Sequence, residues 1–153
     1  MKGTELKIVL SNVIYPDQFH YDLLVCVTPL YEESFGDLLE HSGRKYQVTK
    51  MLDQRIQYLC EHRQSDCCRS EWIEKLSYEK DMYSIIIKDK DLNIRIPFVF
   101  YAHNGKPYVV LLKAFLEKNK RQSKTSSYSS EIKLLRPVLD HMEEMFQNGI
   151  RTD

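Results

Sequence analysis

The chain has 153 residues, of which 22 are basic and 22 acidic, so its formal net charge is zero; 42% of its residues are hydrophobic. This composition predicts one folded domain over residues 1–153, because domains commonly contain about 100–200 residues and this apolar fraction supports a packed core. It excludes collagen-like, low-complexity and disulfide-scaffold proteins, and the balanced charge excludes a protein that coats nucleic acid with its whole surface.

The sequence contains no apolar run that approaches the roughly 20 residues of a membrane-spanning helix, so we expect no membrane partner. Its first residues, MKGTEL, lack the continuous apolar stretch of a secretory signal. We therefore expect a cytoplasmic protein whose four cysteines are reduced thiols.

The zero net charge hides an uneven distribution along the chain. Residues 1–94 carry 12 basic and 16 acidic side chains, residues 95–136 carry nine and two, and residues 137–153 carry one and four. The middle segment therefore has a net charge of +7. Such a concentration of one sign is typical of proteins that contact phosphate groups, although a solvated basic turn has the same composition, and both interpretations stay open.

The N-terminal half contains β-like and helical patterns. Two short β-like runs, 6–13 and 21–28, are separated by a Tyr-Pro-Asp turn, which predicts a hairpin. An acidic stretch, 31–40, follows without a predicted element. Apolar residues then recur at three- and four-residue spacing across 46–62, which predicts an amphipathic helix, and a second short helix is expected over 71–76.

Beyond residue 80 the pattern changes to that of strands. Residues 82–87 form a β-rich run, and 92–101 alternate with the two-residue period of a strand that has one face in a core. Asn104-Gly105 predicts a type I′ hairpin turn, because both positions of that turn need positive φ. Residues 108–115 are the predicted return strand.

The C-terminal part begins with a polar segment, 116–130, which has little to bury and is expected to be exposed and mobile. An amphipathic helix follows over 131–146, with Pro137 as a potential kink. Helices followed by three consecutive strands predict an α+β fold, with an antiparallel sheet and the helices on one of its faces.

The sequence offers few of the residues that carry metal or nucleophilic chemistry. Cys60, His62, Cys67 and Cys68 lie close together but fit no common zinc-ligand spacing, so we predict ordinary thiols and no metal site. The chain also lacks the Gly-x-Ser-x-Gly, Walker A and His-Glu-x-x-His motifs. We therefore predict no cofactor.

The remaining chemistry is cationic, because several basic side chains converge if the three predicted strands are neighbours. These side chains are Arg95, Lys113, Lys118, Lys120, Arg121 and Lys124. Fixed guanidinium and ammonium groups bind a phosphate and stabilise charge that develops on it during transfer. Tyr101, Tyr108 and Tyr128 are candidates to stack on bases of a single strand. The residues therefore favour either a site for RNA or another polyanion, or a solvated basic face.

Four stretches resemble the motifs of one known family: MYSIII at 82–87, LNIRIPF at 92–98, VVLLKAFLEK at 109–118 and SEI at 130–132. In this order they resemble the phage-derived HigB-like branch of the RelE toxin superfamily. The resemblance covers about residues 44–146, and residues 1–40 are treated as an N-terminal extension of unknown role.

The resemblance implies a RelE-like α+β fold and the toxin of a type II toxin-antitoxin system. Such toxins are mRNA endoribonucleases that act on the ribosome without a cofactor, by attack of a ribose 2′-hydroxyl on the neighbouring phosphate, and a helix-turn-helix antitoxin silences them. It implies catalytic roles for Arg95, Lys118 and Lys120. The residues predicted to bind RNA or its phosphates beside them are Lys113, Arg121, Lys124 and Tyr128.

Two positions depart from the family pattern. Ile86 stands where the first-strand arginine is expected, and Glu117 stands where the first of two paired lysines is expected. Losing a cation and gaining a carboxylate weakens the electrostatic stabilisation of a phosphate. The alternative is therefore a catalytically degenerate RelE-fold protein that binds a partner protein or RNA without cleaving it. The oligomeric state stays open.

Overall fold

The computed structural model describes residues 11–13, 23–117 and 124–149. Seven strands, four α-helices and one short 3-10 helix lie in these ranges. The strands are β1 (Ser11–Val13), β2 (Leu24–Val27), β3 (Ile73–Lys75), β4 (Met82–Asp89), β5 (Leu92–His103), β6 (Lys106–Leu111) and β7 (Phe115–Leu116). The helices are α1 (Pro29–Ser42), α2 (Lys45–Asp66), the 3-10 helix η1 (Cys67–Arg69), α3 (Lys124–Asp140) and α4 (Met142–Asn148).

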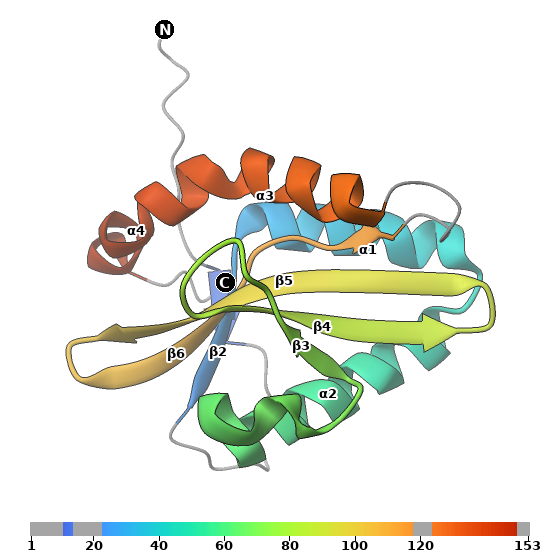
Figure 1. Cartoon of the computed structure of the whole chain (residues 1–153), viewed down its shortest axis with the longest axis horizontal. Helices are drawn as coiled ribbons and strands as arrows, with labels where there is room; N and C mark the ends of the chain where they lie inside the picture. The colour runs from blue at the N-terminus through green and yellow to red at the C-terminus, as the bar shows by residue number, and fades with distance from the viewer. Residues whose placement is uncertain (1–10, 14–22, 118–123, 150–153) are drawn as a thin grey trace, which may run out of the picture.

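The strands form one mixed sheet in the order β1-β2-β6-β5-β4-β3, and β7 pairs with β5 (Figure 1). The strand pairs are antiparallel except for β2 and β6, which are parallel. The expected α+β class is confirmed, but the expectation of a purely antiparallel sheet is wrong at this pair. A parallel pair needs a long crossover connection, and the chain between β2 and β6 provides one.

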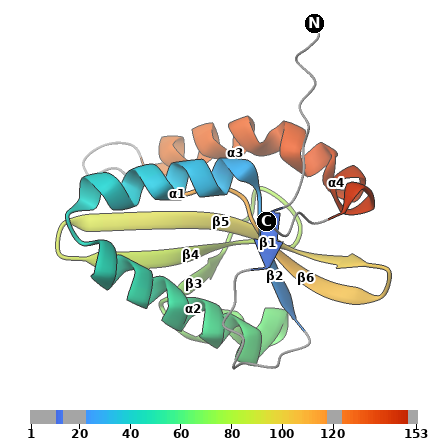
Figure 2. The same cartoon turned by 180° about the vertical axis from the view of Figure 1, so that it is seen from behind.

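Helices cover both faces of the sheet, with α1 and α2 on one face and α3 and α4 on the other (Figures 1 and 2). The expectation that the helices share one face is therefore wrong. The strand composition explains the difference: residues 94–99 of β5 are all buried, because both sides of this strand are covered. The predicted alternation of one buried and one open face does not hold there.

The central hairpins agree with the sequence. Strands β4 and β5 pair from Met82↔Val99 to Asp89↔Leu92, and β5 continues into β6 through a tight turn. Asn104 has a φ of 52° and Gly105 a φ of 78°, which confirms the predicted type I′ geometry. The antiparallel pairing of β1 with β2 agrees with the predicted N-terminal hairpin.

Two N-terminal expectations differ from the structure. The acidic stretch without a predicted element lies in helix α1, which Thr28 caps by accepting a hydrogen bond from the Tyr31 backbone N–H, and Pro29 occupies its first turn. The short helix expected over 71–76 is wrong. Residues 73–75 of this segment form edge strand β3, because Ile73 pairs with Ile85 of β4.

The C-terminal helix begins earlier than expected. Helix α3 starts at Lys124 and carries Pro137 inside it, and a break at His141 separates it from α4. The expected exposure of the whole segment 116–130 is wrong at Tyr128, which is 8% exposed. Within the described ranges, none of the helices combines the length and the apolar character needed to cross a lipid bilayer.

The face of the sheet that α3 and α4 cover is called the second face here. Substitutions at two neighbouring positions of α3 test whether this helix covers it, because Leu135 is fully buried and Leu134 is 61% exposed. We expect Leu135→Ala to lower the free energy of unfolding by about 2–5 kcal/mol, through lost burial and the cavity left behind. Leu134→Ala is the matched control and is expected to stay within about 0.5 kcal/mol of the wild type. Denaturant unfolding measures both; equal effects would contradict the placement of α3.

Candidate functional site

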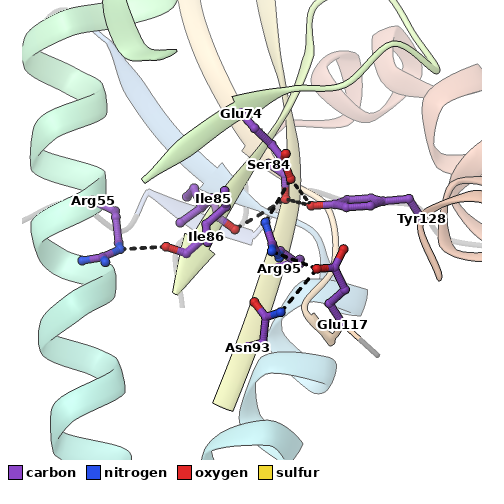
Figure 3. A network of polar contacts seen from close by, with 9 residues as sticks. All are labelled: Arg55, Glu74, Ser84, Ile85, Ile86, Asn93, Arg95, Glu117 and Tyr128. Atoms are coloured by element: carbon purple, nitrogen blue, oxygen red, sulfur yellow. Dashed lines mark hydrogen bonds and ion pairs between the residues drawn. The ribbon is translucent and has the colours of Figure 1, made fainter. Parts of the chain in front are cut away.

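Arg95 lies in the middle of β5, opposite Ile86 of β4, and is 7% exposed. Its guanidinium donates two hydrogen bonds to carboxylates from different parts of the chain (Figure 3). Nη1 lies 3.0 Å from Oε2 of Glu74, and Nη2 lies 2.8 Å from Oε1 of Glu117. Arg95 is therefore the centre of an ionic cluster with one cation and two carboxylates, in which the side chains of Arg95 and Glu117 are buried and the Glu74 side chain is 40% exposed.

Further polar side chains hold the two carboxylates in place (Figure 3). Asn93, two residues before Arg95 on β5, donates from Nδ2 to Oε1 of Glu117 at 3.3 Å. The hydroxyl of Tyr128 donates to Oε2 of Glu74 at 2.7 Å and lies 3.0 Å from Oγ of Ser84. Each carboxylate thus accepts bonds from Arg95 and from a second donor, which fixes its orientation.

The fold brings these groups together from four segments. Positions 93 and 95 share one face of β5, because side chains alternate along a strand. Strand β7 pairs with β5 through Arg95↔Phe115, and the Glu117 backbone N–H then donates to the Asn93 carbonyl at 2.8 Å. Strand β3 supplies Glu74 and helix α3 supplies Tyr128. The cluster therefore depends on the tertiary pairing of distant residues.

Burial raises the pKa of the Tyr128 phenol well above its ordinary value, and the hydrogen bond to Glu74 raises it further. The Ser84 hydroxyl and the Arg95 charge act in the opposite direction. The net upward shift keeps this phenol protonated, so that it remains a donor to Glu74.

A second buried arginine, Arg55 of α2, lies on the other side of Ile86 (Figure 3). Its Nε donates to the Ile86 carbonyl at 2.9 Å and its Nη1 to the Met51 carbonyl at 3.2 Å. The guanidinium carbon lies 4.4 Å from the ring centre of Trp72, in a cation–π contact. Burial lowers the pKa of Arg55 from its ordinary value.

A polar pocket of about 460 Å³ opens where the two arginines approach the edge of β4. Its lining contains three cations and two carboxylates beside an indole and an aliphatic side chain. These residues are Arg55, Lys88, Arg95, Glu71, Glu74, Trp72 and Ile86. Guanidinium and ammonium groups are suited to bind an anion, and the carboxylates are suited to accept hydrogen bonds from hydroxyl or amino groups.

The other residues predicted for the site have different surroundings. Lys113 forms an ion pair of 2.5 Å with Glu131 of α3, so its charge is balanced by a neighbour. Lys118, Lys120 and Arg121 lie outside the described residues. Lys124 is the first residue of α3. Of the predicted site residues, the structure thus brings Arg95 and Tyr128 together through Glu74.

Of the aromatic side chains proposed for base stacking, Tyr108 and Tyr128 are buried and Tyr101 is partly buried. The Tyr128 ring contacts Phe115 edge-on, at 5.4 Å between ring centres. Tyr101 and Tyr108 lie 4.9 Å and 4.7 Å from the ring of Phe146 in α4. These rings therefore stabilise the second face of the sheet.

Glu74 and Arg55 belong to the site but were not predicted from the sequence. Glu74 lies inside the segment 71–76 that was wrongly predicted as a helix, and nothing in its local pattern indicates a partner on β5. Arg55 carries a signal, because it falls on the buried stripe of α2 with Leu52, Ile56 and Leu59. A basic residue at a core position of an amphipathic helix predicts a buried polar contact.

Comparisons with known proteins add no assignment to this geometry: no protein-family model, no curated protein and no solved structure matches the chain. The function is therefore argued from the fold and the site.

Tyr128→Phe tests the buried phenol through the pH dependence of stability. An unfolded tyrosine releases its proton near pH 10, whereas folded Tyr128 keeps its proton to higher pH. Its contribution to stability is thus complete below pH ~10 and is lost as pH rises further. The wild type should lose up to about 1.4 kcal/mol per pH unit relative to Tyr128→Phe above pH ~10.

Denaturant unfolding of both proteins between pH ~8 and pH ~12 measures this difference. Tyr46→Phe is the matched control, because Tyr46 is 73% exposed and its ring meets water in both states. The control should stay close to the wild type throughout. Parallel stability curves for the wild type and Tyr128→Phe would contradict the burial of the Tyr128 phenol.

Proposed function

We propose that this chain is a RelE/HigB-like protein that binds RNA and does not cleave it. One observation carries the second half of this proposal: Arg95, the cation to which the resemblance gives a catalytic role, is bound by both Glu74 and Glu117. A metal-free ribonuclease needs cations that face the scissile phosphate in order to stabilise its developing charge.

The charge balance around Arg95 opposes such a role. The guanidinium and its two carboxylates have a net charge of −1 when ionised, and Arg95 is 7% exposed. A phosphate that approached Arg95 would lie next to the carboxylates of Glu74 and Glu117, which already occupy two of the guanidinium nitrogens and carry the same sign of charge as the phosphate. Arg95 is therefore better suited to hold the sheet together than to bind a reacting phosphate.

The proposed RNA binding is supported by the basic segment 95–136 and by the order of the elements. Lys106 at the β5–β6 hairpin and Lys133 on α3 are exposed, and both belong to the segment with the net charge of +7. The meander of β4, β5 and β6, then basic residues, then a helix follow in the order of the family motifs. On this proposal the partners are ribosome-bound mRNA and a helix-turn-helix antitoxin, in the cytoplasm.

A second candidate function is the one that the resemblance implies, an mRNA endoribonuclease of a type II toxin-antitoxin system. A specific feature favours it: Glu117, which contacts Arg95, directly precedes Lys118, and Lys120 is two residues further on. The segment that carries the proposed catalytic lysines thus directly follows a residue of the Arg95 cluster. Cleavage would require a route for phosphate to this cluster.

RNA binding is tested by the fluorescence anisotropy of a labelled single-stranded RNA at several salt concentrations. If Lys106 and Lys133 contact phosphates, then Lys106→Gln and Lys133→Gln should each reduce the slope of log affinity against log salt by about 0.7. Lys50→Gln is the control, because Lys50 is an exposed lysine on α2, on the opposite side of the sheet. The proposed binding would be refuted if the RNA did not bind, or if Lys50→Gln reduced the salt slope as much as Lys106→Gln and Lys133→Gln do.

Cleavage is tested separately, by primer extension on a message translated in a reconstituted system. We expect the wild type to leave the message intact. Cleavage by the wild type that is lost in Arg95→Gln would replace our proposal with the endoribonuclease. Cleavage that appears only in the double variant Ile86→Arg, Glu117→Lys would identify the two departures as the cause of the silent site, with circular dichroism as the check on folding.

A further inference from the structure

Arg55 differs from Arg95 in having no counter-charge. It is 6% exposed, and its bonds go to two neutral backbone carbonyls and to the face of Trp72. Among the described residues no carboxylate pairs with it, and desolvation is the one cause that shifts its pKa. A buried guanidinium that lacks an anionic partner is costly, so this position favours the arrival of an anion.

The guanidinium also has donor capacity to spare, because the bonds within the described chain use Nε and Nη1. An arginine carries five N–H donors in a planar fork. The fork lines the pocket of about 460 Å³ at the edge of β4, where Lys88 adds an exposed ammonium that pairs with no described carboxylate. Two cations that form no ion pair with a described carboxylate thus line one cavity, together with Glu71 and Glu74.

We propose that this pocket binds a phosphomonoester on a hydroxylated carrier, with Arg55 and Lys88 holding the phosphate. A phosphomonoester offers three terminal oxygens and a charge close to −2 at neutral pH, which matches a guanidinium fork and an ammonium together. Glu71 and Glu74, in the same lining, accept hydrogen bonds from hydroxyl groups of the carrier. The volume is in the usual range of small-ligand sites.

This inference goes beyond the proposed RNA binding and does not require it, because Arg55 and Lys88 lie outside the basic segment 95–136. The same phosphate chemistry has two sources, a free sugar phosphate and the 5′-phosphate end of an RNA. Either source would place its phosphate at Arg55 and Lys88, and the two differ in the group that carries the phosphate, a free sugar or an RNA chain.

Calorimetric titration of the full chain with ribose 5-phosphate tests the pocket, with ribose and succinate as comparison ligands. We expect ribose 5-phosphate to bind with a Kd below about 1 mM, and ribose and succinate to bind at least about tenfold more weakly. Lys88→Gln removes an exposed side chain without disturbing the core and should weaken binding about tenfold. Lys50→Gln, the matched control, should leave the affinity unchanged.

Arg55→Lys tests the fork itself, because it keeps the positive charge but removes the planar set of donors. It should weaken binding at least as much as Lys88→Gln, with thermal unfolding as the check that the variant is folded. Titration with a short RNA, 5′-phosphorylated or 5′-hydroxyl, identifies the source. Tighter binding of the 5′-phosphorylated RNA than of the 5′-hydroxyl RNA assigns the pocket to an RNA end, and equal affinity of the two RNAs assigns it to the free ester.

Three results would overturn the inference: no binding of ribose 5-phosphate at millimolar concentration, equal binding of succinate, or equal effects of Lys88→Gln and Lys50→Gln. None of these results bears on the anisotropy measurement of RNA binding by Lys106 and Lys133. A failure of this pocket and a failure of the proposed function are therefore distinguishable.

Discussion

The buried charge of Arg95 is the constraint around which the second face of the sheet is arranged. A buried guanidinium in a central strand is expensive to remove from water, and this cost is offset in part when its charge is paired. Glu74 and Glu117 pair with its Nη1 and Nη2 from two distant segments, whereas its buried Nε has no hydrogen-bond partner within the described residues. The ion pairs therefore connect edge strand β3 and the end of β7 to β5, and Tyr128 adds helix α3 to the same network.

The two buried arginines show how burial gives different properties to the same side chain. Arg95 has two carboxylates at hydrogen-bonding distance, so its charge is satisfied within the fold. Arg55 has carbonyl oxygens and an indole ring, which stabilise a cation without neutralising it. A guanidinium that is paired with carboxylates favours a rigid structure, whereas a guanidinium without an anionic partner is suited to bind an anion. The chemistry of the pocket therefore depends more on Arg55 than on the residue that the sequence singles out.

Local patterns predicted those elements whose determinants lie within a few residues. The spacing in α2, the β4–β5 pairing and the Asn104-Gly105 turn depend on periodicity and on backbone φ, and all were predictable. The parallel β2–β6 pair and the helices on both faces depend on contacts across the whole chain. The site divides in the same way: Arg95 was a candidate from its strand, but Glu74 becomes its partner through tertiary pairing alone.

Ile86 and Glu117, which depart from the motifs that the sequence resembles, both lie next to Arg95. Ile86 is the cross-strand partner of Arg95, and Glu117 contacts the Arg95 guanidinium directly. A second arginine at position 86 would place another cation beside Arg95, and a lysine at 117 would remove a carboxylate that compensates it. Both changes move the local charge in the same direction, so their effects on stability should not add independently. With an aliphatic side chain at 86 and carboxylates at 74 and 117, the positive charge of Arg95 is more than compensated, and none of it is left for a phosphate.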